Sequence, residues 1–394
     1  MIEEYLNLVS KEDCCGCNAC VNICPRNCIS FKLDEHGSYY PYKNKENCID
    51  CGACEIVCPV LHNNSFKLNN KIYACKNKND EIRKISSSGG IFSAIAKCVI
   101  EHKGYVVGAA FSNDYYNVHH VIIDNEEDLA LLRGAKYIHS NIENTFKEIK
   151  KLLLSNIIVL FSGTPCQIAG LKSFLHHQEY INLICVDVVC HGVPCTGVYQ
   201  WYIKTLEKKY NSKVIFVTFR DKKNGWRNSS VVFKFENGED LSMPSADNSY
   251  MKGYINNLYI RSSCTKCKFK DFQSGSDFTL SDFWGSSELR KYKKDNIGVS
   301  VVSVNTEKGA KIFNIIKDQL NDVSLIDKGV AYVFNENVSI SAKINSRSQE
   351  FLANYRTEDF DRLINQYVPN QPIEIKSSQS FIYTIKRFIY LLFH

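Results

Sequence analysis

The stretch that decides the fold reads CCGCNACVNICP over residues 14–25, and CIDCGACEIVCP repeats its pattern over residues 48–59. Each copy has the form Cys-x2-Cys-x2-Cys-x3-Cys-Pro, and the second copy begins 34 residues after the first. Ten of the 18 cysteines of this 394-residue chain lie between positions 14 and 58. In a reducing compartment, such crowding of cysteines indicates metal binding rather than disulfide bonds.

The repeated spacing is the one by which bacterial ferredoxins hold two [4Fe–4S] clusters, which pass single electrons. Three thiolates bind one cluster, and the fourth cysteine, three residues further on, reaches the other cluster. Structural zinc usually takes two separated knuckles, so it is the weaker reading. Cys15 and Cys28 fall outside the pattern and are expected to be buried packing residues. We predict one cluster on Cys14, Cys17, Cys20 and Cys58, and a second on Cys48, Cys51, Cys54 and Cys24.

The composition is that of an ordinary globular chain, with 44% hydrophobic and 23% charged residues. At roughly 150 residues per domain, the length predicts two or three domains. The net charge of +6 is spread along the chain without a basic run, so no nucleic-acid partner is expected. No apolar stretch approaches 18 residues and the first residues lack a signal-peptide pattern, which predicts a cytoplasmic protein with no transmembrane segment.

Local patterns predict the secondary structure. Hairpins are expected at His36-Gly37 and Asn237-Gly238, and a long helix is expected from about Asn141 to Leu154. Apolar strands such as IIVLF (157–161) and LICVDVV (183–189) alternate with helical patterns, which predicts a sheet with helices on its faces. The expected fold class is an α+β ferredoxin domain followed by a larger α/β region with a mixed, partly parallel sheet.

The predicted division of the chain is 1–68 for the ferredoxin domain, 69–155 and 156–335 for the larger region, and 336–394 for a helical tail. An Asn/Lys-rich linker, HNNSFKLNNK, ends the first domain. The last fourteen residues, FIYTIKRFIYLLFH, are too few to span a bilayer. We expect them to form a helix that docks on the core, on a partner or, by peripheral contact, on a membrane surface.

Two further cysteines follow neighbouring predicted strands. Thr164 and Pro165 suit the N-cap and first position of a helix, which places Cys166 in its first turn, and Cys190 directly follows LICVDVV. The carboxyl ends of parallel strands meet at one edge of a sheet, where such folds bind ligands. With Cys264 and Cys267, these residues could hold a third cluster. They could equally be two core cysteines and a separate zinc or redox pair.

Signals for other ligands are weaker. No GxGxxG follows a strand and no P-loop sequence is present, which argues against a Rossmann dinucleotide site. Ser87, Ser88, Gly89 and Gly90 offer hydroxyl and N–H groups at a helix N-terminus, which suits a phosphate but also serves as a plain cap. The loop RDKKNGWR (220–227) is suited to an anion or a ring, and equally to a solvated turn.

Several sequence blocks occur together in one order. They are SSSGGIFSAIA (86–96), RGAKYIHS (133–140), LFSGTPCQIAGLK (160–172), VDVVCHGVPC (186–195), CTKC (264–267) and SDFTLSDFWG (276–285). In these blocks the chain resembles the coenzyme F420 hydrogenase/dehydrogenase beta-subunit family, with a two-cluster ferredoxin domain fused in front. The resemblance extends from Cys14 to about Leu320, but Cys195 stands where the family often has Ser, and Ser281 where Gly is frequent.

The resemblance implies FAD bound without a Rossmann fingerprint, beside an iron–sulfur cluster. By that resemblance, Cys166, Cys190, Cys264 and Cys267 become the ligands of a third [4Fe–4S] cluster, and Cys195 is a possible substitute ligand. The implied flavin neighbours are Ser87, Ser88, Gly89, Gly90, Lys136, Tyr137, Ser140, Gly163, Thr164 and Pro165.

The expected function is therefore that of an iron–sulfur flavoprotein oxidoreductase. It would exchange hydride at FAD with coenzyme F420 or a similar small molecule, and single electrons with ferredoxin or a partner subunit. Two alternatives stay open. One is a ferredoxin-dependent reductase of a small organic substrate, and the other is an electron-transfer subunit without catalysis of its own. No catalytic acid or base stands out, since His191, the best titratable candidate, is also a typical structural hydrogen-bonding group.

Overall fold

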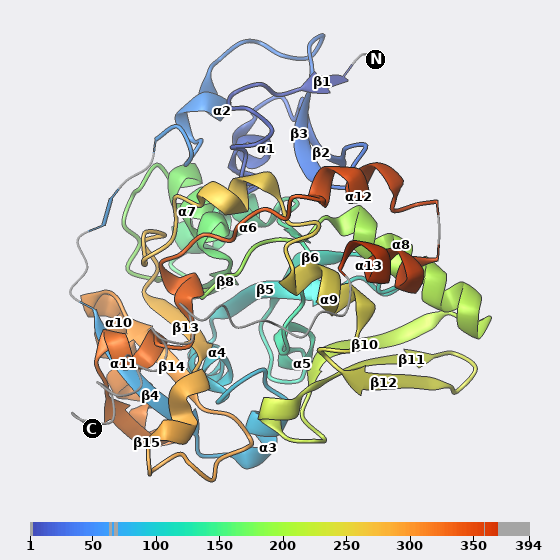
Figure 1. Cartoon of the computed structure of the whole chain (residues 1–394). Coiled ribbons are helices and arrows are strands. Elements are labelled where there is room, and N and C mark those ends of the chain that lie inside the picture. Colours follow the sequence, from blue (N-terminus) through green and yellow to red (C-terminus); the bar gives the residue numbers. More distant parts are fainter. Residues whose placement is uncertain (1–2, 63–64, 67–69, 358, 369–394) are drawn as a thin grey trace.

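The computed structural model describes residues 3–62, 65–66, 70–357 and 359–368. Its N-terminal elements are β1 (Glu3–Tyr5), α1 (Ala19–Ile23), β2 (Ile29–Leu33), β3 (Tyr39–Asn44) and α2 (Ala53–Ile56). The three strands form an antiparallel sheet in the order β1-β3-β2, drawn in blue in Figure 1. The predicted turn at His36 and Gly37 is confirmed, and Gly37 takes the positive φ that this turn needs.

A nine-stranded sheet forms the centre of the molecule. Its strands are β4 (Lys71–Asn77), β5 (Tyr105–Phe111), β6 (Val118–Ile123), β7 (Ser140–Asn141), β8 (Val159–Gly163), β9 (Leu183–Val188), β13 (Phe278–Asp282), β14 (Ser300–Val304) and β15 (Leu320–Leu325). They lie in the order β15-β4-β14-β13-β9-β8-β5-β6-β7. The four strands β13, β9, β8 and β5 run parallel, and antiparallel pairs flank them. This is the predicted fold class, a mixed and partly parallel sheet.

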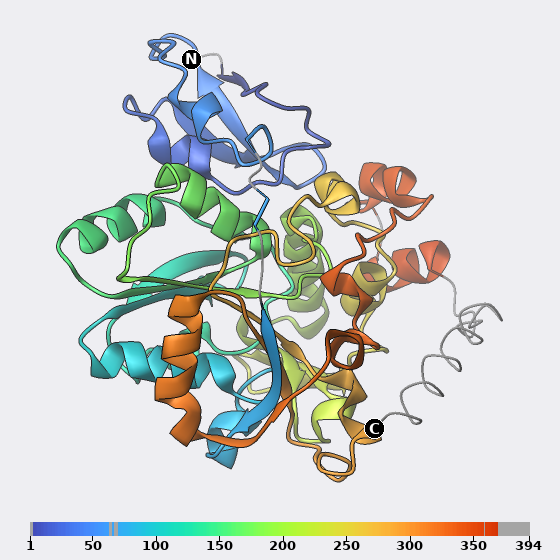
Figure 2. The same ribbon diagram turned by 90° about the vertical axis from the view of Figure 1, so that its left-hand side faces the viewer.

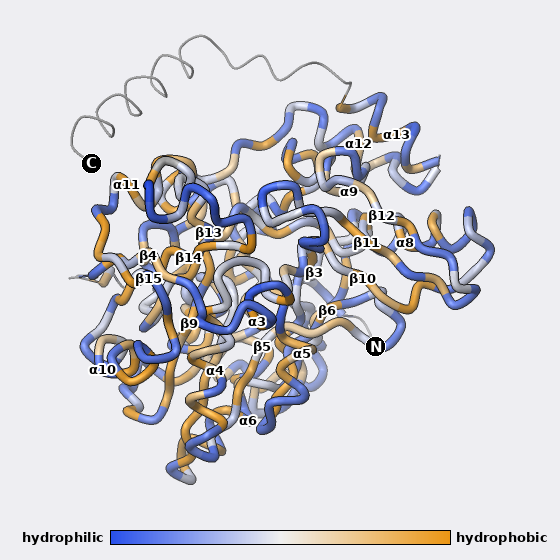
Figure 3. Tube along the Cα trace, turned by 90° about the horizontal axis from the view of Figure 1, so that it is seen from below, coloured by the Kyte–Doolittle hydropathy of each residue, from blue (hydrophilic) through white to orange (hydrophobic). Residues whose placement is uncertain are grey.

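Helices cover both faces of this sheet. Residues of α4 and α10 pack on one face, and residues of α6 and α7 pack on the other. Along β8, Leu160 faces the first group while Val159 and Phe161 face the second, so this strand is apolar on both sides. The helices are α3 (Asp80–Lys84), α4 (Ile91–Glu101), α5 (Leu129–Leu132), α6 (Thr145–Leu154), α7 (Pro165–Phe174), α10 (Glu307–Ile316) and α11 (Lys328–Tyr332). Figure 3 shows hydrophobic colouring along α4 and the central strands, and hydrophilic colouring along α3.

A second, three-stranded sheet and its helices lie beside the large sheet. Aromatic rings dominate the core here, with Tyr202 stacked on Tyr250 and both rings buried. The predicted hairpin at Asn237 and Gly238 is confirmed. The elements are α8 (Thr196–Tyr210), β10 (Val214–Asp221), β11 (Ser230–Phe235), β12 (Asp240–Pro244), α9 (Ser249–Ile255), α12 (Ser348–Asn354) and α13 (Phe360–Tyr367), with short 3-10 turns at 226–228, 262–266, 284–288, 317–319 and 336–338.

One predicted boundary is wrong. The helix expected from Asn141 begins only at Thr145, because Ser140 and Asn141 pair with β6 as strand β7. The side chain of Asn141 is also engaged, since its Oδ1 accepts a hydrogen bond from Nδ2 of Asn18 at 2.6 Å. Tertiary contacts with the N-terminal region therefore override the local helical pattern.

Three further predictions concern membrane-spanning helices, the C-terminal helix and the division into domains. No helix among the described residues is long and apolar enough to cross a membrane. The docking helix predicted over residues 381–394 lies outside the described residues. One sheet takes strands from both 69–155 and 156–335, and the proposed division of the chain stays a prediction.

The ferredoxin-like region packs on α6 and α7, as Figure 2 shows. Cys17, Ala19 and Val57 join the apolar cluster that these two helices form with the sheet. Gly170 permits the closest approach, because a methyl group at that position would lie only 2.7 Å from Cβ of Cys17. This contact brings the first cysteine run directly against helix α7.

This approach generates a stability prediction for Gly170→Ala. In a helix interior, Gly→Ala ordinarily raises the free energy of unfolding by up to about 1 kcal/mol. Here we expect the free energy of unfolding to fall by about 1–3 kcal/mol, because the new methyl group overpacks against Cys17. Denaturant unfolding of anaerobically purified protein measures the change. A variant as stable as the parent chain would show that α7 and Cys17 are not in close contact.

Candidate functional site

The carboxyl ends of β8 and β9 lie side by side because these strands pair in parallel. Helix α7 starts directly after β8, and Thr164 forms the predicted N-cap, with its backbone N–H donating to Oε1 of Gln167 at 3.0 Å. Cys166 therefore stands in the first turn of α7, and Cys190 follows the end of β9. The two cysteines reach the same edge of the sheet, as their positions after parallel strands predict.

Cys264 and Cys267 join this edge from a distant part of the chain. They belong to a 3-10 turn, Ser262–Lys266, and its C-cap. The backbone N–H of Val193 donates to Sγ of Cys264 at 3.3 Å, which fixes the turn against the segment that follows Cys190. Burial and the thiols of Cys264 and Cys166 raise the pKa of Cys190 well above its ordinary value. The four cysteines are thus electrostatic neighbours, and their role as cluster ligands stays a prediction.

The ferredoxin cysteines form two groups. Cys14, Cys17, Cys20 and Cys58 all line one small cavity, as the first predicted cluster requires. In the second group, burial and the thiols of Cys24 and Cys48 raise the pKa of Cys54, so these three side chains are neighbours. Cys51 is exposed at the surface. In the described part of the chain, no three His, Cys, Asp or Glu side chains are placed to hold a single metal ion.

The two cysteines outside the repeated pattern lie beside predicted cluster ligands. Sγ of Cys28 is 3.3 Å from Sγ of Cys24, and burial together with that neighbour raises the pKa of Cys28 to about 12. Cys15 packs in one apolar cluster with Cys17 and in another with Cys166, and burial together with the thiol of Cys17 raises its pKa well above the ordinary value. Cys28 is buried, as predicted, but the position of Cys15 between the first cysteine run and helix α7 was not predicted.

A cavity of about 450 Å³ lies at this edge of the sheet. Cys15, Cys166, Cys190 and His191 form one part of its wall. Gly89 and Pro165 are not in the wall. The N–H of Gly89 donates to Oγ of Ser300 at 2.9 Å, and Pro165 is the first residue of α7. The other predicted flavin neighbours line it, namely Ser87, Ser88, Gly90, Lys136, Tyr137, Ser140, Gly163 and Thr164.

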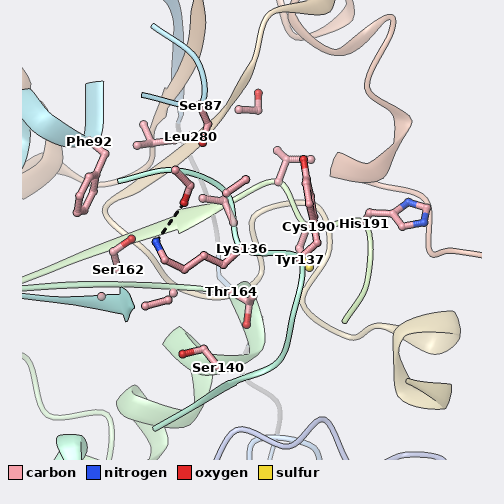
Figure 4. Close-up of a pocket in the computed structure, with 18 of the residues that line it drawn as sticks. Ser87, Phe92, Lys136, Tyr137, Ser140, Ser162, Thr164, Cys190, His191 and Leu280 are labelled. Atoms are coloured by element: carbon pink, nitrogen blue, oxygen red, sulfur yellow. Dashed lines mark hydrogen bonds between the residues drawn. The ribbon is translucent and has the colours of Figure 1, made fainter. Parts of the chain in front are cut away.

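Lys136 places a buried amine inside the cavity (Figure 4). Its Nζ donates to backbone carbonyl oxygens, the shortest bond being 2.9 Å to the carbonyl of Arg133, and among the described residues it forms no ion pair with a carboxylate. Burial lowers its pKa to about 7. An anionic or electron-rich group in the cavity would compensate this amine.

A second cationic group, Arg220, also lines the cavity. Nη1 of Arg220 donates to Oδ2 of Asp282 at 3.1 Å, and its guanidinium lies 5.2 Å from the ring centre of Trp284. Trp284 stacks on Trp226 with ring centres 5.0 Å apart and an interplanar angle of 2°. Nε of Arg220 is buried without a hydrogen-bond partner. The ring of Trp284, backed by the buried Trp226, thus stands in the cavity wall beside the ion pair of Arg220 and Asp282.

The histidines near the cavity are held by hydrogen bonds. Nδ1 of His120 pairs with Oγ of Ser140 at 2.8 Å, and burial lowers its pKa to about 4. The ring nitrogens of His191 lie 3.2 Å and 2.6 Å from the side-chain oxygens of Asn337 and Asn257. His191 thus makes hydrogen-bonding contacts of the structural kind that the sequence analysis considered for it.

Family models match three segments of the chain. Residues 72–147 match the model of the coenzyme F420 hydrogenase/dehydrogenase beta subunit N-terminus, and residues 158–327 match that of its C-terminus. The chain belongs to this beta-subunit family. Residues 13–61 also match a 4Fe–4S dicluster domain. Together, the family and the dicluster domain imply an oxidoreductase component that transfers electrons through iron–sulfur clusters.

Two individual proteins are similar to parts of this beta-subunit homologue. An uncharacterised ferredoxin of Methanocaldococcus jannaschii is 40% identical over 35 residues, which is 9% of this chain and 46% of the ferredoxin. The chain thus matches less than half of that protein's length. A solved structure of the F420-reducing [NiFe] hydrogenase complex from Methanosarcina barkeri aligns with a TM-score of 0.46 and 17% identity, covering 75% of this chain and 91% of that one.

Some residues of the site carried only a weak sequence signal. Arg220 belongs to the basic loop 220–227, whose sequence allowed ring or anion contact, and Asp282 and Trp284 lie in the block SDFTLSDFWG. Trp226 of the same loop is buried behind Trp284, outside the cavity wall. The contacts between the loop and the block join segments about 60 residues apart and were not predicted. Sγ of Cys195, the possible substitute ligand, lies 3.0 Å from Oγ of Ser38. Cys195 is not in the cavity wall.

The neutral, buried His120 makes the stability of this family member depend on pH. A histidine has a pKa near 6.5 when unfolded, so the unfolded chain gains a proton as the pH falls below 6.5 while His120 stays neutral when folded. His120 should therefore cost about 1.4 kcal/mol of stability at pH 5.5 relative to neutral pH. Denaturant unfolding at both pH values measures this loss, and His120→Gln should remove that share. An unchanged pH dependence in the variant would contradict a neutral, buried His120.

Proposed function

We propose that this chain is an iron–sulfur flavoprotein oxidoreductase of the cytoplasm. It would exchange two electrons as hydride at FAD with coenzyme F420 or a similar small molecule. Single electrons would pass through three [4Fe–4S] clusters to or from a ferredoxin or a partner subunit. One observation carries the proposal: the cavity wall contains Cys166 and Cys190 of the cysteine quartet, and also Cys15 of the ferredoxin-like region.

The cavity has the features that FAD requires. Its volume lies in the range of cofactor sites, and the α4 N-terminus at Gly90 offers backbone N–H groups that suit a phosphate. The buried amine of Lys136 lacks a carboxylate partner among the described residues. The pyrophosphate of FAD would supply negative charge to it, and the oxygens of a flavin ring would accept its hydrogen bonds. FAD, when bound, would supply both hydride exchange and one-electron exchange. The protein's part is to hold this group and exclude water from it.

The cysteine quartet supports a third cluster beside this cavity. Cys166 and Cys190 are anchored at the ends of two parallel strands, while Cys264 is held by the N–H of Val193. Hydrogen bonds from backbone N–H groups to ligand sulfurs are typical of iron–sulfur sites. A cluster bound here would stand between the cavity and the ferredoxin-like region.

The second ferredoxin cluster offers an exit to the surface. Cys51 is exposed, and its neighbours Ile49 and Ile56 are 59% and 60% exposed. A small apolar surface around a redox centre suits a transient electron-transfer partner. We propose that a ferredoxin or partner subunit contacts the chain at this end.

A second candidate function is a ferredoxin-dependent reductase of a small organic substrate. The ring of Trp284, beside Arg220 in the cavity wall, favours it because the two side chains offer an aromatic ring and a guanidinium to a planar, anionic molecule. Bleaching of the flavin by reduced deazaflavin would favour the first function. Substrate-dependent reoxidation after reduction by ferredoxin would favour the second.

The deciding experiment is the content of iron, sulfide and extracted flavin per chain in anaerobically purified protein. About twelve irons and one FAD are expected, since each of three clusters holds four irons. About eight irons without flavin in fully assembled protein would overturn the enzyme proposal and favour a non-catalytic electron-transfer subunit.

Lys136→Met tests the flavin site. Loss of the buried amine should weaken FAD binding at least about tenfold, since a charge-assisted contact contributes about 1.5–3 kcal/mol. Flavin content and fluorescence titration measure the effect. Lys97→Met, which changes a half-exposed lysine on α4, is the matched control and should retain full flavin. Equal flavin affinity in both variants would remove Lys136 from the site.

Cys264→Ala tests the third cluster. We expect the iron content to fall by about four per chain while the ferredoxin clusters remain, because those use other cysteines. Cys98→Ala, at a buried cysteine in the apolar cluster of α4, is the control and should keep all iron. Unchanged iron in Cys264→Ala would favour the reading of Cys264 and Cys267 as a separate pair.

A further inference from the structure

Arg261 lies buried between two groups of predicted cluster cysteines. Arg261 is only 3% exposed and forms the N-cap of the turn that carries Cys264. Its Nε donates to the backbone carbonyl of Cys14 at 2.7 Å, and its Nη1 donates to that of Tyr39 at 2.6 Å. The guanidinium thus joins the ferredoxin-like region to the turn of the cysteine quartet.

The position of this guanidinium is tightly fixed. It lies over the ring of Tyr40, 4.2 Å from the ring centre. A methyl group at Gly16, in the first cysteine run, would lie 3.1 Å from Cζ of Arg261 and 2.8 Å from Cε1 of His139. Only a residue without a side chain leaves room for the guanidinium here.

The positive charge of Arg261 has no carboxylate partner. In the part of the chain that the structure describes, Arg261 forms no ion pair, and its Nη2 is buried without a hydrogen-bond acceptor. The groups that face it are the thiols of Cys14, Cys15 and Cys264, the phenol of Tyr40 and the imidazole of His139, which burial keeps neutral. An unpaired buried cation costs several kcal/mol, so a negative group is required at this place.

We propose that Arg261 is a positioning residue that compensates the negative charge of the two clusters that meet here and raises their reduction potentials. These are the cluster on Cys14, Cys17, Cys20 and Cys58 and the third cluster on Cys166, Cys190, Cys264 and Cys267. The proposal rests on the cluster assignment in the proposed function.

The effect on the potentials follows from charge. Arginine stays protonated in proteins, so its charge is constant while an electron arrives at one cluster and leaves for the other. Each one-electron reduction adds a negative charge to a cluster that already carries thiolate ligands, and a fixed positive charge nearby favours the reduced form. Arg261 would therefore ease electron entry at the junction from either side.

The test is the midpoint potential of each cluster in Arg261→Gln, measured by redox titration with electron paramagnetic resonance on anaerobically purified, iron-loaded protein. Gln can keep hydrogen bonds to the carbonyls but lacks the charge. We expect the equilibrium constant for reduction of at least one of the two clusters to fall about tenfold or more, a shift of about 59 mV to more negative potential. The cluster that includes Cys51 should keep its potential.

Two further variants separate charge from structure. Arg261→Lys keeps the positive charge, so the midpoint potentials of both clusters should stay close to those of the parent protein. Arg83→Gln removes a buried arginine that is paired with Asp295 and lies outside the cavity wall, and it should lower stability without shifting any cluster potential.

The outcomes are distinguishable. Full iron and unchanged potentials in Arg261→Gln would overturn the proposal, as would an equal shift in Arg261→Lys. If Arg261→Gln loses iron, retention of iron by Arg261→Lys supports a charge role, and loss from both variants overturns it. About eight irons in the parent protein would instead mean that the third cluster of the proposed function is absent, and the first cluster alone would then decide the role of Arg261.

Discussion

The close approach of helix α7 to the ferredoxin-like region is the constraint on which the redox arrangement depends. Cys166 and Gly170 are four residues apart on α7 and therefore lie on one face of the helix. Gly170 meets Cys17, and Cys166 meets Cys15, so one helical turn separates the contacts with two cysteines of the first run. A larger residue at 170 would force Cys17 away from α7 and lengthen the distance between the proposed clusters.

Buried positive charge is the second common feature of this junction. Lys136 and Arg261 lack carboxylate partners among the described residues, whereas the buried Arg83 is paired with Asp295 and lies outside the wall of the 450 Å³ cavity. Burial of a cation is costly unless it is compensated. The two cations without a carboxylate stand where negative cofactors are proposed. Compensation alone does not mark the site, because Arg220 lines the cavity although Asp282 pairs with it, and Lys222 lies outside the wall with only backbone carbonyls as partners.

Sequence patterns predicted the parts of this molecule that depend on local chemistry. Thr164 caps α7 because an N-cap needs only its own first turn, and Cys166 and Cys190 meet because parallel strands end at one edge. The start of the helix at Thr145 and the place of Cys15 were not predictable, since both depend on the docking of the ferredoxin-like region. No sequence pattern indicated the role of Arg261. Its burial and the absence of a carboxylate partner among the described residues are visible only in the folded structure.

The direction of β13 decides whether the aromatic surface can take part in the site. This strand pairs in parallel with β9, so Asp282 at its end leaves the sheet at the same edge as Cys190. Its pairing with β14 is antiparallel, which returns the chain away from that edge. Had β13 run the other way, Asp282 and Trp284 would stand at the opposite edge, and the chain would keep its clusters without a flat surface beside the cavity. The parallel core therefore brings Asp282 and Trp284 to the edge of the sheet that also carries Cys190.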